Sequence, residues 1–475
     1  MDSDHFAAEV LTRLPYTAND QQVATIASLA RFVMAPPEGR DRVFMLNGYA
    51  GTGKSSIMGA LVRALPAIHS GAVLLAPTGR AAKVFGAYAG RAAMTIHRKI
   101  YKHSLDGAAG SYSGAAPVQD NKHRNCVFIV DEASMIGDGD SRGNNLLQDL
   151  IQYVYTGENC RMVLLGDTAQ LPPVGSTLSP AMNRDILRSF GLKVTAVTLT
   201  EVARQSLDSG ILFNATLLRK AMLLDNAPVP KIISRGFDDI ILADPEDMID
   251  LLDEAYRRDG IEETIVITRS NRSATDFNRA IRAQVLYREE ELCVSDLLIV
   301  AKNNYYWPRF AKGLSFIANG DIVSIVKVYG SEMRYGCRFA DVRLALTDGD
   351  TEFDAKIIID PLYTDTPALP QDSSNRLFNA IINDGDRFSP STPYEARLRA
   401  LRDDPYWNAL QVKYAYAVTC HKAQGGQWHN VFVDVSYVPA DALGLEFYRW
   451  LYTAVTRART RLYLISPPED MLSQI

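Results

Sequence analysis

The sequence predicts an α/β fold built on doubly wound parallel sheets, and three observations carry that prediction. Continuous apolar runs at 43–46, 72–76 and 127–130 are typical of buried parallel strands. Each run ends in polar or glycine-rich residues, and segments with helical spacing separate the runs. The same alternation returns from residue 264, which predicts a second unit of this kind. Residues 301–410 instead alternate and contain turns, which predicts a small inserted antiparallel β domain.

Composition narrows the class of protein. The 475 residues suffice for two to four domains, and an apolar fraction of 47% is that of a soluble globular protein. No apolar run reaches the ~18 residues that a transmembrane helix needs, and the first residues lack a secretory signal. No membrane partner is therefore expected. The five scattered cysteines include no C-x-x-C pair, which argues against disulfides and zinc and favours a reducing, cytoplasmic location.

A phosphate-binding loop follows the first apolar run. It reads G-x-x-x-x-G-K-S and leads into a segment with helical spacing. In this arrangement the loop N–H groups and the helix N-terminus face a phosphate, the lysine reaches the β- and γ-phosphates, and the serine can ligate Mg²⁺. The sequence thus predicts binding of a nucleoside triphosphate. The residues of the loop and the first helical turn are Gly48, Tyr49, Ala50, Gly51, Thr52, Gly53, Lys54, Ser55 and Ser56.

Two further strand ends carry polar residues that suit phosphate chemistry. Asp131 and Glu132 follow the run 127–130, where Asp131 is expected to hold Mg²⁺ and Glu132 to deprotonate the attacking water. The alternative is a polar strand end with two exposed acids. Gln170 follows another apolar run, at 162–165, and is placed to sense the γ-phosphate, while Pro172 and Pro173 stiffen the loop beyond it.

Other candidates are weaker taken singly. Gln21, on a helix that Thr17 is predicted to cap, could read an adenine edge or simply be solvated. Arg457 lies in a helix before the last strand, where an arginine usually snorkels to the surface. A triphosphatase with two lobes needs a cation from the second lobe, however, so Arg204 and Arg457 are arginine-finger candidates.

Charge is distributed unevenly, although the net charge is only −5. From Arg42 to Leu105 there is no acidic residue, whereas nine residues are basic. This favours a groove that binds a polyanion, and the alternative is a solvated face together with the nucleotide site.

The motifs taken in order resemble superfamily 1 helicases, and within them the RecD-like and Dda-like 5′-to-3′ group. The matching stretches are 17–21, 48–55, 76–83, 95–97, 131–134, 166–173, 199–205, 419–425 and 452–459. The resemblance implies an ATP-dependent DNA helicase or translocase with two RecA-like lobes, ATP and Mg²⁺ in the cleft, and single-stranded DNA across both lobes. A monomeric motor acting on forked duplex DNA is expected.

The resemblance also implies domain limits and site residues. Lobe 1A spans 1–199 with a small 1B pin at 100–126, lobe 2A spans 200–300 and 411–475, and an SH3-like 2B domain occupies 301–410. Gln21 and Gly425 join the ATP site. The DNA contacts are expected from Pro77, Thr78, Arg80, Lys83, Thr95, His97, Pro172, Pro173, Arg269, Asn271, Thr419, His421 and Lys422.

Three residues depart from the pattern of the family. Ala203 stands where relatives often have an aromatic residue, Gln427 where many have a carboxylate, and Tyr112 is the one bulky residue of a glycine-rich pin. Two other functions remain open from the residues: a nucleotide-dependent DNA switch or clamp that does not unwind, and a small-molecule phosphotransferase. A nuclease has little support, because no carboxylate cluster appears beyond Asp131 and Glu132.

Overall fold

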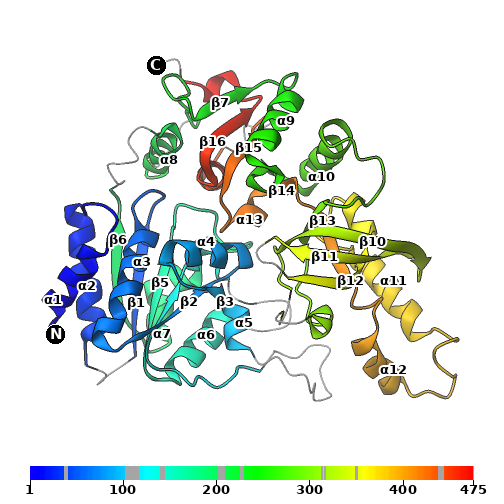
Figure 1. The fold of residues 1–475 in the computed structure, drawn as a ribbon, viewed down its shortest axis with the longest axis horizontal. Helices are drawn as coiled ribbons and strands as arrows, with labels where there is room; N and C mark the ends of the chain where they lie inside the picture. The colour runs from blue at the N-terminus through cyan, green and yellow to red at the C-terminus, as the bar shows by residue number, and fades with distance from the viewer. Residues whose placement is uncertain are drawn as a thin grey trace.

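The chain forms two parallel sheets, each flanked by helices, and a closed β-barrel that packs beside the second sheet (Figure 1). Within the described segments, no helix combines the length and apolar character needed to cross a bilayer. The computed structural model describes residues 1–36, 41–101, 117–137, 139, 145–201, 209–224, 229–311, 314, 317–347, 351–436 and 443–473.

The first lobe contains a six-stranded parallel sheet with the strand order β3-β2-β4-β5-β1-β6. Its strands are β1 (Arg42–Gly48), β2 (Gly71–Ala76), β3 (Met94–Thr95), β4 (Arg124–Val130), β5 (Glu158–Gly166) and β6 (Lys193–Leu199). Its helices are α1 (Ser3–Thr12), α2 (Asp20–Met34), α3 (Lys54–Ala64), α4 (Gly79–Ala89), α5 (Ile96–Ile100), α6 (Leu146–Tyr155) and α7 (Arg184–Ser189).

Alternation along the strands explains why helices cover both faces of this sheet. In β1, Phe44 and Leu46 pack into a core with α1, α2 and α3, whereas Val43 and Met45 pack into a second core with α5, α6 and α7. Successive side chains of a strand point to opposite faces, so a strand buried on both sides must be apolar throughout. This confirms the prediction of a doubly wound parallel sheet.

The second lobe repeats the architecture with a five-stranded parallel sheet of order β14-β8-β15-β16-β7. Its strands are β7 (Ile240–Ala243), β8 (Thr264–Thr268), β14 (Ala417–Thr419), β15 (Trp428–Asp434) and β16 (Ala458–Ile465). Its helices are α8 (Gly210–Ala221), α9 (Met248–Asp259), α10 (Asn271–Ala280), α13 (Cys420–Ala423) and α14 (Leu445–Val455).

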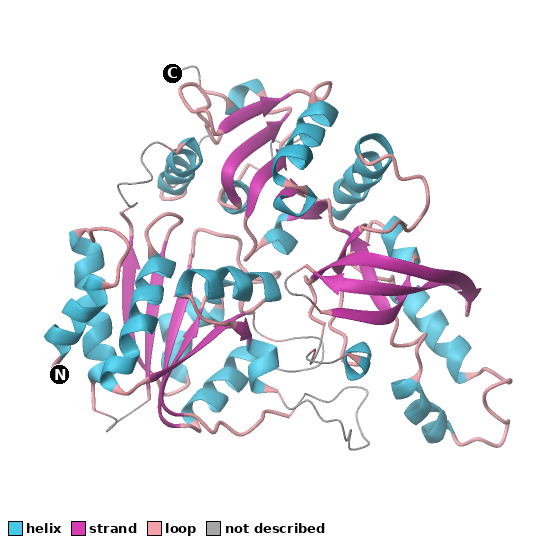
Figure 2. Cartoon of the chain, viewed as in Figure 1, coloured by secondary structure: helices cyan, strands magenta, loops and turns pink. Residues whose placement is uncertain are grey.

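The barrel lies between β8 and β14 in the sequence and beside the second lobe in space (Figure 2). It is formed by β9 (Leu297–Val300), β10 (Ile322–Arg334), β11 (Cys337–Leu346), β12 (Glu352–Ile358) and β13 (Leu410–Tyr414), and it carries α11 (Gln371–Ile382) and α12 (Tyr394–Ala400). The predicted small β domain is therefore present. One pair, β12 and β13, is parallel, because the helical segment between these two strands returns the chain to the same end of the barrel.

A buried ion cluster joins the barrel to the second lobe. Asp296, just before β9, is fully buried and accepts hydrogen bonds from Arg282 Nη2 at 2.9 Å and from Arg288 Nη1 at 2.6 Å. The hydroxyl of Tyr416 donates a third at 2.8 Å. Because three side chains converge on one carboxylate, this cluster fixes how the barrel is seated.

Removing that carboxylate should destabilise the protein strongly. We expect Asp296→Ala to lower the free energy of unfolding by about 3–5 kcal/mol, since the buried Arg282 and the partly buried Arg288 lose their counter-ion. Urea unfolding followed by circular dichroism measures the effect. Asp354→Ala is the matched control, because Asp354 pairs with Arg343 on the barrel surface and should cost under about 1 kcal/mol. Equal losses for the two variants would contradict a structural role for the cluster.

Candidate functional site

The phosphate loop connects β1 to α3 in a conformation that requires glycine. Gly51 and Gly53 have φ angles of 73° and 85°, in the left-handed region. A Cβ atom on Gly53 would lie 2.4 Å from the Tyr16 hydroxyl and 2.7 Å from Gln22 Nε2. No side chain among the described residues caps the N-terminus of α3, so its first N–H groups can bind an anion. Lys54 donates from Nζ to the carbonyl oxygens of Gly48 and Tyr49, which keeps its ammonium over the loop.

The paired carboxylates lie beside this loop. The N–H of Glu132 donates to Asp131 Oδ1 at 2.8 Å, and Glu132 itself has a φ of 51°. Burial and the charge of Glu132 raise the pKa of the Asp131 carboxyl above its usual range, while the charges of Lys54 and Arg457 oppose that shift. A desolvated carboxylate next to a second carboxylate favours a bound cation. The donor set of Asp131 and the Ser55 hydroxyl therefore fits Mg²⁺, which commonly takes few protein ligands together with substrate phosphates.

Gln170 is buried, and its Oε1 atom has no hydrogen-bond partner among the described residues. A buried amide oxygen without a partner is uncommon in native proteins, where such atoms bind protein, water or a ligand. This orphaned acceptor fits the predicted role of Gln170 in orienting water or sensing phosphate.

The second lobe reaches this cleft with the end of α14. Arg457 is 3% exposed, so its side chain does not snorkel to the surface. Its guanidinium donates to the carbonyl oxygens of Thr453 and Gly426, at 3.0 and 3.2 Å, and its Nη1 lies 3.8 Å from Glu132 Oε1. A preoriented cation from the second lobe thus lies beside the carboxylate of the first. Arg204, the other arginine-finger candidate, lies outside the described residues.

Side chains of the second lobe also hold the segment that carries Gln170. The N–H of Leu171 donates to Thr453 Oγ1 at 2.8 Å, and Gln424 Nε2 donates to the carbonyl oxygen of Leu171 at 2.6 Å. Pro172 and Pro173 follow directly, and a Cβ atom on Gly137 would lie 3.3 Å from Pro173. The backbone N–H and the carbonyl oxygen of Leu171 are therefore both hydrogen-bonded to the second lobe.

Gln22 forms a hydrogen bond with the phosphate loop, a contact that the sequence did not reveal. Its Nε2 donates to the carbonyl oxygen of Thr52 at 3.0 Å. Gln21 instead bonds the segment between the lobes: its Oε1 accepts from the N–H groups of Thr200 and Glu201 at 2.8 and 3.1 Å. The adenine-reading role of Gln21 stays a prediction.

A capping signal would have identified Gln22. Asn19, and not Thr17, caps α2, and its side chain forms a reciprocal capping box with Gln22. The spacing N-x-x-Q in the sequence carries that signal.

Candidate DNA contacts of the first lobe gather at the carboxyl ends of β2 and β3. Pro77 follows β2, Thr78 caps α4 by accepting from the N–H of Ala81 at 3.2 Å, and Thr95 caps α5 in the same manner. His97 lies on α5 with its ring 5.6 Å from that of Tyr101. These groups share one edge of the sheet, where open α/β sheets bind ligands.

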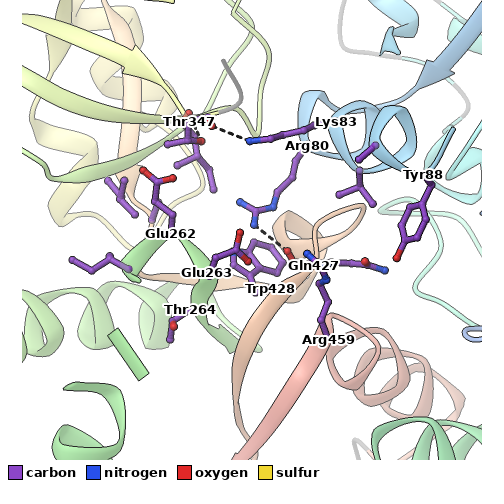
Figure 3. Close-up of a pocket in the computed structure, with 16 residues that line it drawn as sticks. Arg80, Lys83, Tyr88, Glu262, Glu263, Thr264, Thr347, Gln427, Trp428 and Arg459 are labelled. Carbon is purple, nitrogen blue, oxygen red and sulfur yellow. Dashed lines mark hydrogen bonds between the residues drawn. The ribbon is translucent and has the colours of Figure 1, made fainter. Parts of the chain in front are cut away.

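Two cations of α4 already contact the rest of the protein. Arg80 Nη2 donates to the carbonyl oxygen of Gln427 at 3.1 Å, and its guanidinium lies 4.1 Å from the centre of the Trp428 ring. Lys83 Nζ donates to the carbonyl oxygen of Thr347 on the barrel at 3.0 Å. Both side chains line a cavity of about 320 Å³ between the first lobe, the second lobe and the barrel. Figure 3 shows the Lys83 side chain pointing toward Thr347 and the Arg80 side chain toward Gln427 and Trp428. Arg80 and Lys83 therefore connect the first lobe to the second lobe and to the barrel. Their role in DNA binding stays a prediction.

Candidates of the second lobe lie at its own strand ends. Thr419 ends β14 opposite Thr268 of β8, Arg269 follows β8 with its guanidinium 5.4 Å from the Phe447 ring, and Asn271 begins α10. His421 and Lys422 lie on α13, where desolvation lowers the pKa of Lys422 to about 8 and that of His421 below its usual value.

Gly425, just after α13, lies at a close contact between the two lobes. It has a φ of 72°, and a Cβ atom on it would lie 2.8 Å from Ala81 Cβ. Only glycine permits this approach of α13 to α4. Of the predicted pin, residues 102–116, including Tyr112, lie outside the described residues, as does Ala203.

Comparisons with known proteins assign both lobes. A family model described as an AAA domain matches residues 18–223, and one described as a UvrD-like helicase C-terminal domain matches residues 414–465. The chain is 33% identical over 171 residues to the ATP-dependent RecD2 DNA helicase of Deinococcus radiodurans, a match covering 36% of this chain and 21% of that protein. The chain therefore spans about a fifth of the length of that relative.

A second relative matches along nearly its whole length. The chain is 25% identical over 441 residues to the ATP-dependent DNA helicase dda of Enterobacteria phage T4, which covers 88% of this chain and 93% of the phage protein. Among solved structures, a Pif1 helicase overlaps 97% of this chain and 95% of its own, with 16% identity and a TM-score of 0.47. The two family matches fall on the two lobes, and the chain is similar in sequence to the RecD2 and dda helicases, in agreement with the resemblance to superfamily 1 helicases that the motifs carry.

Proposed function

We propose that the protein is an ATP-dependent motor that moves 5′ to 3′ along single-stranded DNA and unwinds forked duplex DNA. The observation that carries this proposal is the double tether of Leu171 to Gln424 and Thr453 of the second lobe. Leu171 lies between Gln170, on the ATP side, and Pro172, on the DNA side. A movement of the second lobe is therefore transmitted to both sites through one peptide segment.

The residues around the cleft divide the work of hydrolysis. Lys54 and the N-terminus of α3 bind the β- and γ-phosphates, and Ser55 with Asp131 would hold Mg²⁺. Glu132 accepts a proton from the attacking water, and Gln170 orients that water. Arg457 stabilises charge on the γ-phosphate from the second lobe, with Arg204 as the second cation of the pair. When bound, Mg²⁺ supplies charge neutralisation.

The strand ends supply two grips on one DNA strand. Thr78 and Thr95 lie on the first lobe, and Arg269, Asn271 and Thr419 on the second, so lobe closure changes the distance between the grips. If the lobes grip alternately, each ATP cycle moves the protein along the strand. Phosphate contacts should dominate the affinity and make it strongly dependent on salt. Polarity follows the group that the motifs resemble, and the unpaired cysteines suit a reducing, cytoplasmic setting.

Forked DNA tests the proposal. We expect ATP-dependent strand separation of a fork with a single-stranded 5′ tail, and little separation of a duplex with only a 3′ tail. The Lys54→Ala variant, which loses the phosphate-binding ammonium, is the negative control. DNA-stimulated hydrolysis without strand separation would overturn the unwinding role in favour of a switch or clamp. Hydrolysis that DNA does not stimulate would favour a small-molecule phosphotransferase.

A further inference from the structure

A single tyrosine of the second lobe contacts the phosphate loop and the Gln170 segment at once. Tyr452 lies on α14 and is 1% exposed. Its hydroxyl accepts a hydrogen bond from the N–H of Ala50 at 2.9 Å and donates one to Asp167 Oδ2 at 2.7 Å. Ala50 belongs to the phosphate loop, and Asp167 follows β5. Both partners of this hydroxyl are therefore in the first lobe.

Asp167 transmits this contact to Gln170. Its Oδ1 accepts from the N–H of Ala169 at 3.0 Å, and its carbonyl oxygen accepts from the N–H of Gln170 at 3.2 Å. Asp167 thus closes the turn that presents the orphaned Gln170 side chain. Strands β1 and β5 are neighbours in the sheet, so the Tyr452 hydroxyl bridges two adjacent strand ends.

The phenol is suited to a permanent neutral bridge. Burial and the adjacent Asp167 carboxylate raise the pKa of Tyr452 well above its ordinary value, so the hydroxyl keeps its proton throughout the physiological range. A hydrogen bond to a buried carboxylate is also stronger than one between neutral groups. Arg457 follows the same helix, so the seating of Tyr452 also sets the position of that guanidinium beside Glu132.

We propose that Tyr452 is a positioning residue that couples closure of the second lobe to the phosphate loop and to Gln170. The inference rests on the proposed ATPase function and deepens it. Tyr452 does not take part in the chemistry itself. It aligns Ala50 and Gln170 in the first lobe with Arg457 in the second, so that the site is complete only when the lobes are seated on each other. Its loss should therefore slow the chemical step more than it weakens ATP binding.

The test compares two tyrosine-to-phenylalanine variants. Tyr452→Phe removes the bridging hydroxyl and keeps the ring. Tyr256→Phe is the matched control, because the buried Tyr256 hydroxyl has no hydrogen-bond partner among the described residues of the chain. We expect Tyr452→Phe to lower kcat of the DNA-stimulated ATPase about 10- to 100-fold, the effect of one hydrogen bond to a charged group. The KM for ATP should change less than about threefold, and the control should match the wild-type protein.

A double-mutant cycle with Asp167→Asn identifies the pathway. If Tyr452 acts through Asp167, the double variant should lose little more than the more impaired single variant. If the fold-losses in kcat of the two single variants multiply in the double variant, the inference is overturned. Equal kcat values for Tyr452→Phe and Tyr256→Phe would also overturn it. A rise in KM with unchanged kcat would also overturn it, since that pattern reports uniform binding. An inactive wild-type protein in the same assay would instead overturn the proposed function.

Discussion

Glu132→Gln leaves ATP binding intact and lowers DNA-stimulated ATP turnover by about 10²- to 10⁴-fold, the range of general base catalysis. Glutamine has nearly the shape of glutamate but cannot accept the proton of the attacking water. Glu132 lies beside Asp131, and its Oε1 lies 3.8 Å from Arg457 Nη1. Removing the charge of Glu132 leaves the phosphate-binding groups of the cleft in place. The variant should therefore hold ATP in the closed site.

Filter binding of radiolabelled ATP and a steady-state ATPase assay separate the two effects of Glu132→Gln. Glu158→Gln is the matched control, because Glu158 forms an exposed ion pair with Arg124 at the far end of β5. The control should hydrolyse ATP at the wild-type rate. Normal turnover by Glu132→Gln would show that a different residue positions the water.

Arg457→Ala should lower kcat by about 10³- to 10⁵-fold, the usual effect of an arginine finger. The guanidinium is buried and held by carbonyl oxygens of the second lobe, so in the proposed mechanism its charge would meet the γ-phosphate without a costly rearrangement. Arg457→Lys keeps the charge but loses the planar donor fork, and it should recover only part of the rate.

Arg459→Ala controls for the loss of a neighbouring cation. Arg459 is exposed and lies two residues further along the chain, so its removal should change kcat less than about twofold. Quench-flow measurement of single-turnover hydrolysis reports the chemical step directly. If Arg457→Ala and Arg459→Ala hydrolyse ATP equally fast, Arg457 has no role in catalysis. Thermal melting of both variants checks that the fold is retained.

Local patterns were sufficient to predict the fold class and the phosphate loop. Lys54, Asp131 and Gln170 each follow an apolar strand, and parallel strands place their carboxyl ends at one edge of a sheet. Arg457 of the second lobe is buried, and its role at the γ-phosphate stays a prediction. The predictions of the fold class and the phosphate loop succeed because each depends on a short stretch of neighbouring residues or on a group that phosphate chemistry requires.

Contacts between distant segments could not be predicted in the same manner. Tyr452 and Asp167 are separated by 285 positions, and Leu171 and Thr453 by 282, so no local pattern links them. Arg80 and Lys83 are predicted DNA contacts because the motifs resemble a helicase family and because both cations follow the carboxyl end of a strand. In the structure, Arg80 and Lys83 donate hydrogen bonds to carbonyl oxygens of the second lobe and the barrel. The charge of a residue does not specify which group will face it in the fold.

Directional movement along DNA tests the central claim most directly. Single-stranded oligonucleotides carrying biotin at one end are bound to streptavidin, and its release is followed after adding the protein and ATP. The account predicts ATP-dependent release of streptavidin from the 3′ end, since a motor moving 5′ to 3′ arrives there, and none with Glu132→Gln. Release from the 5′ end, or no release by a protein that hydrolyses ATP on the same DNA, would contradict it.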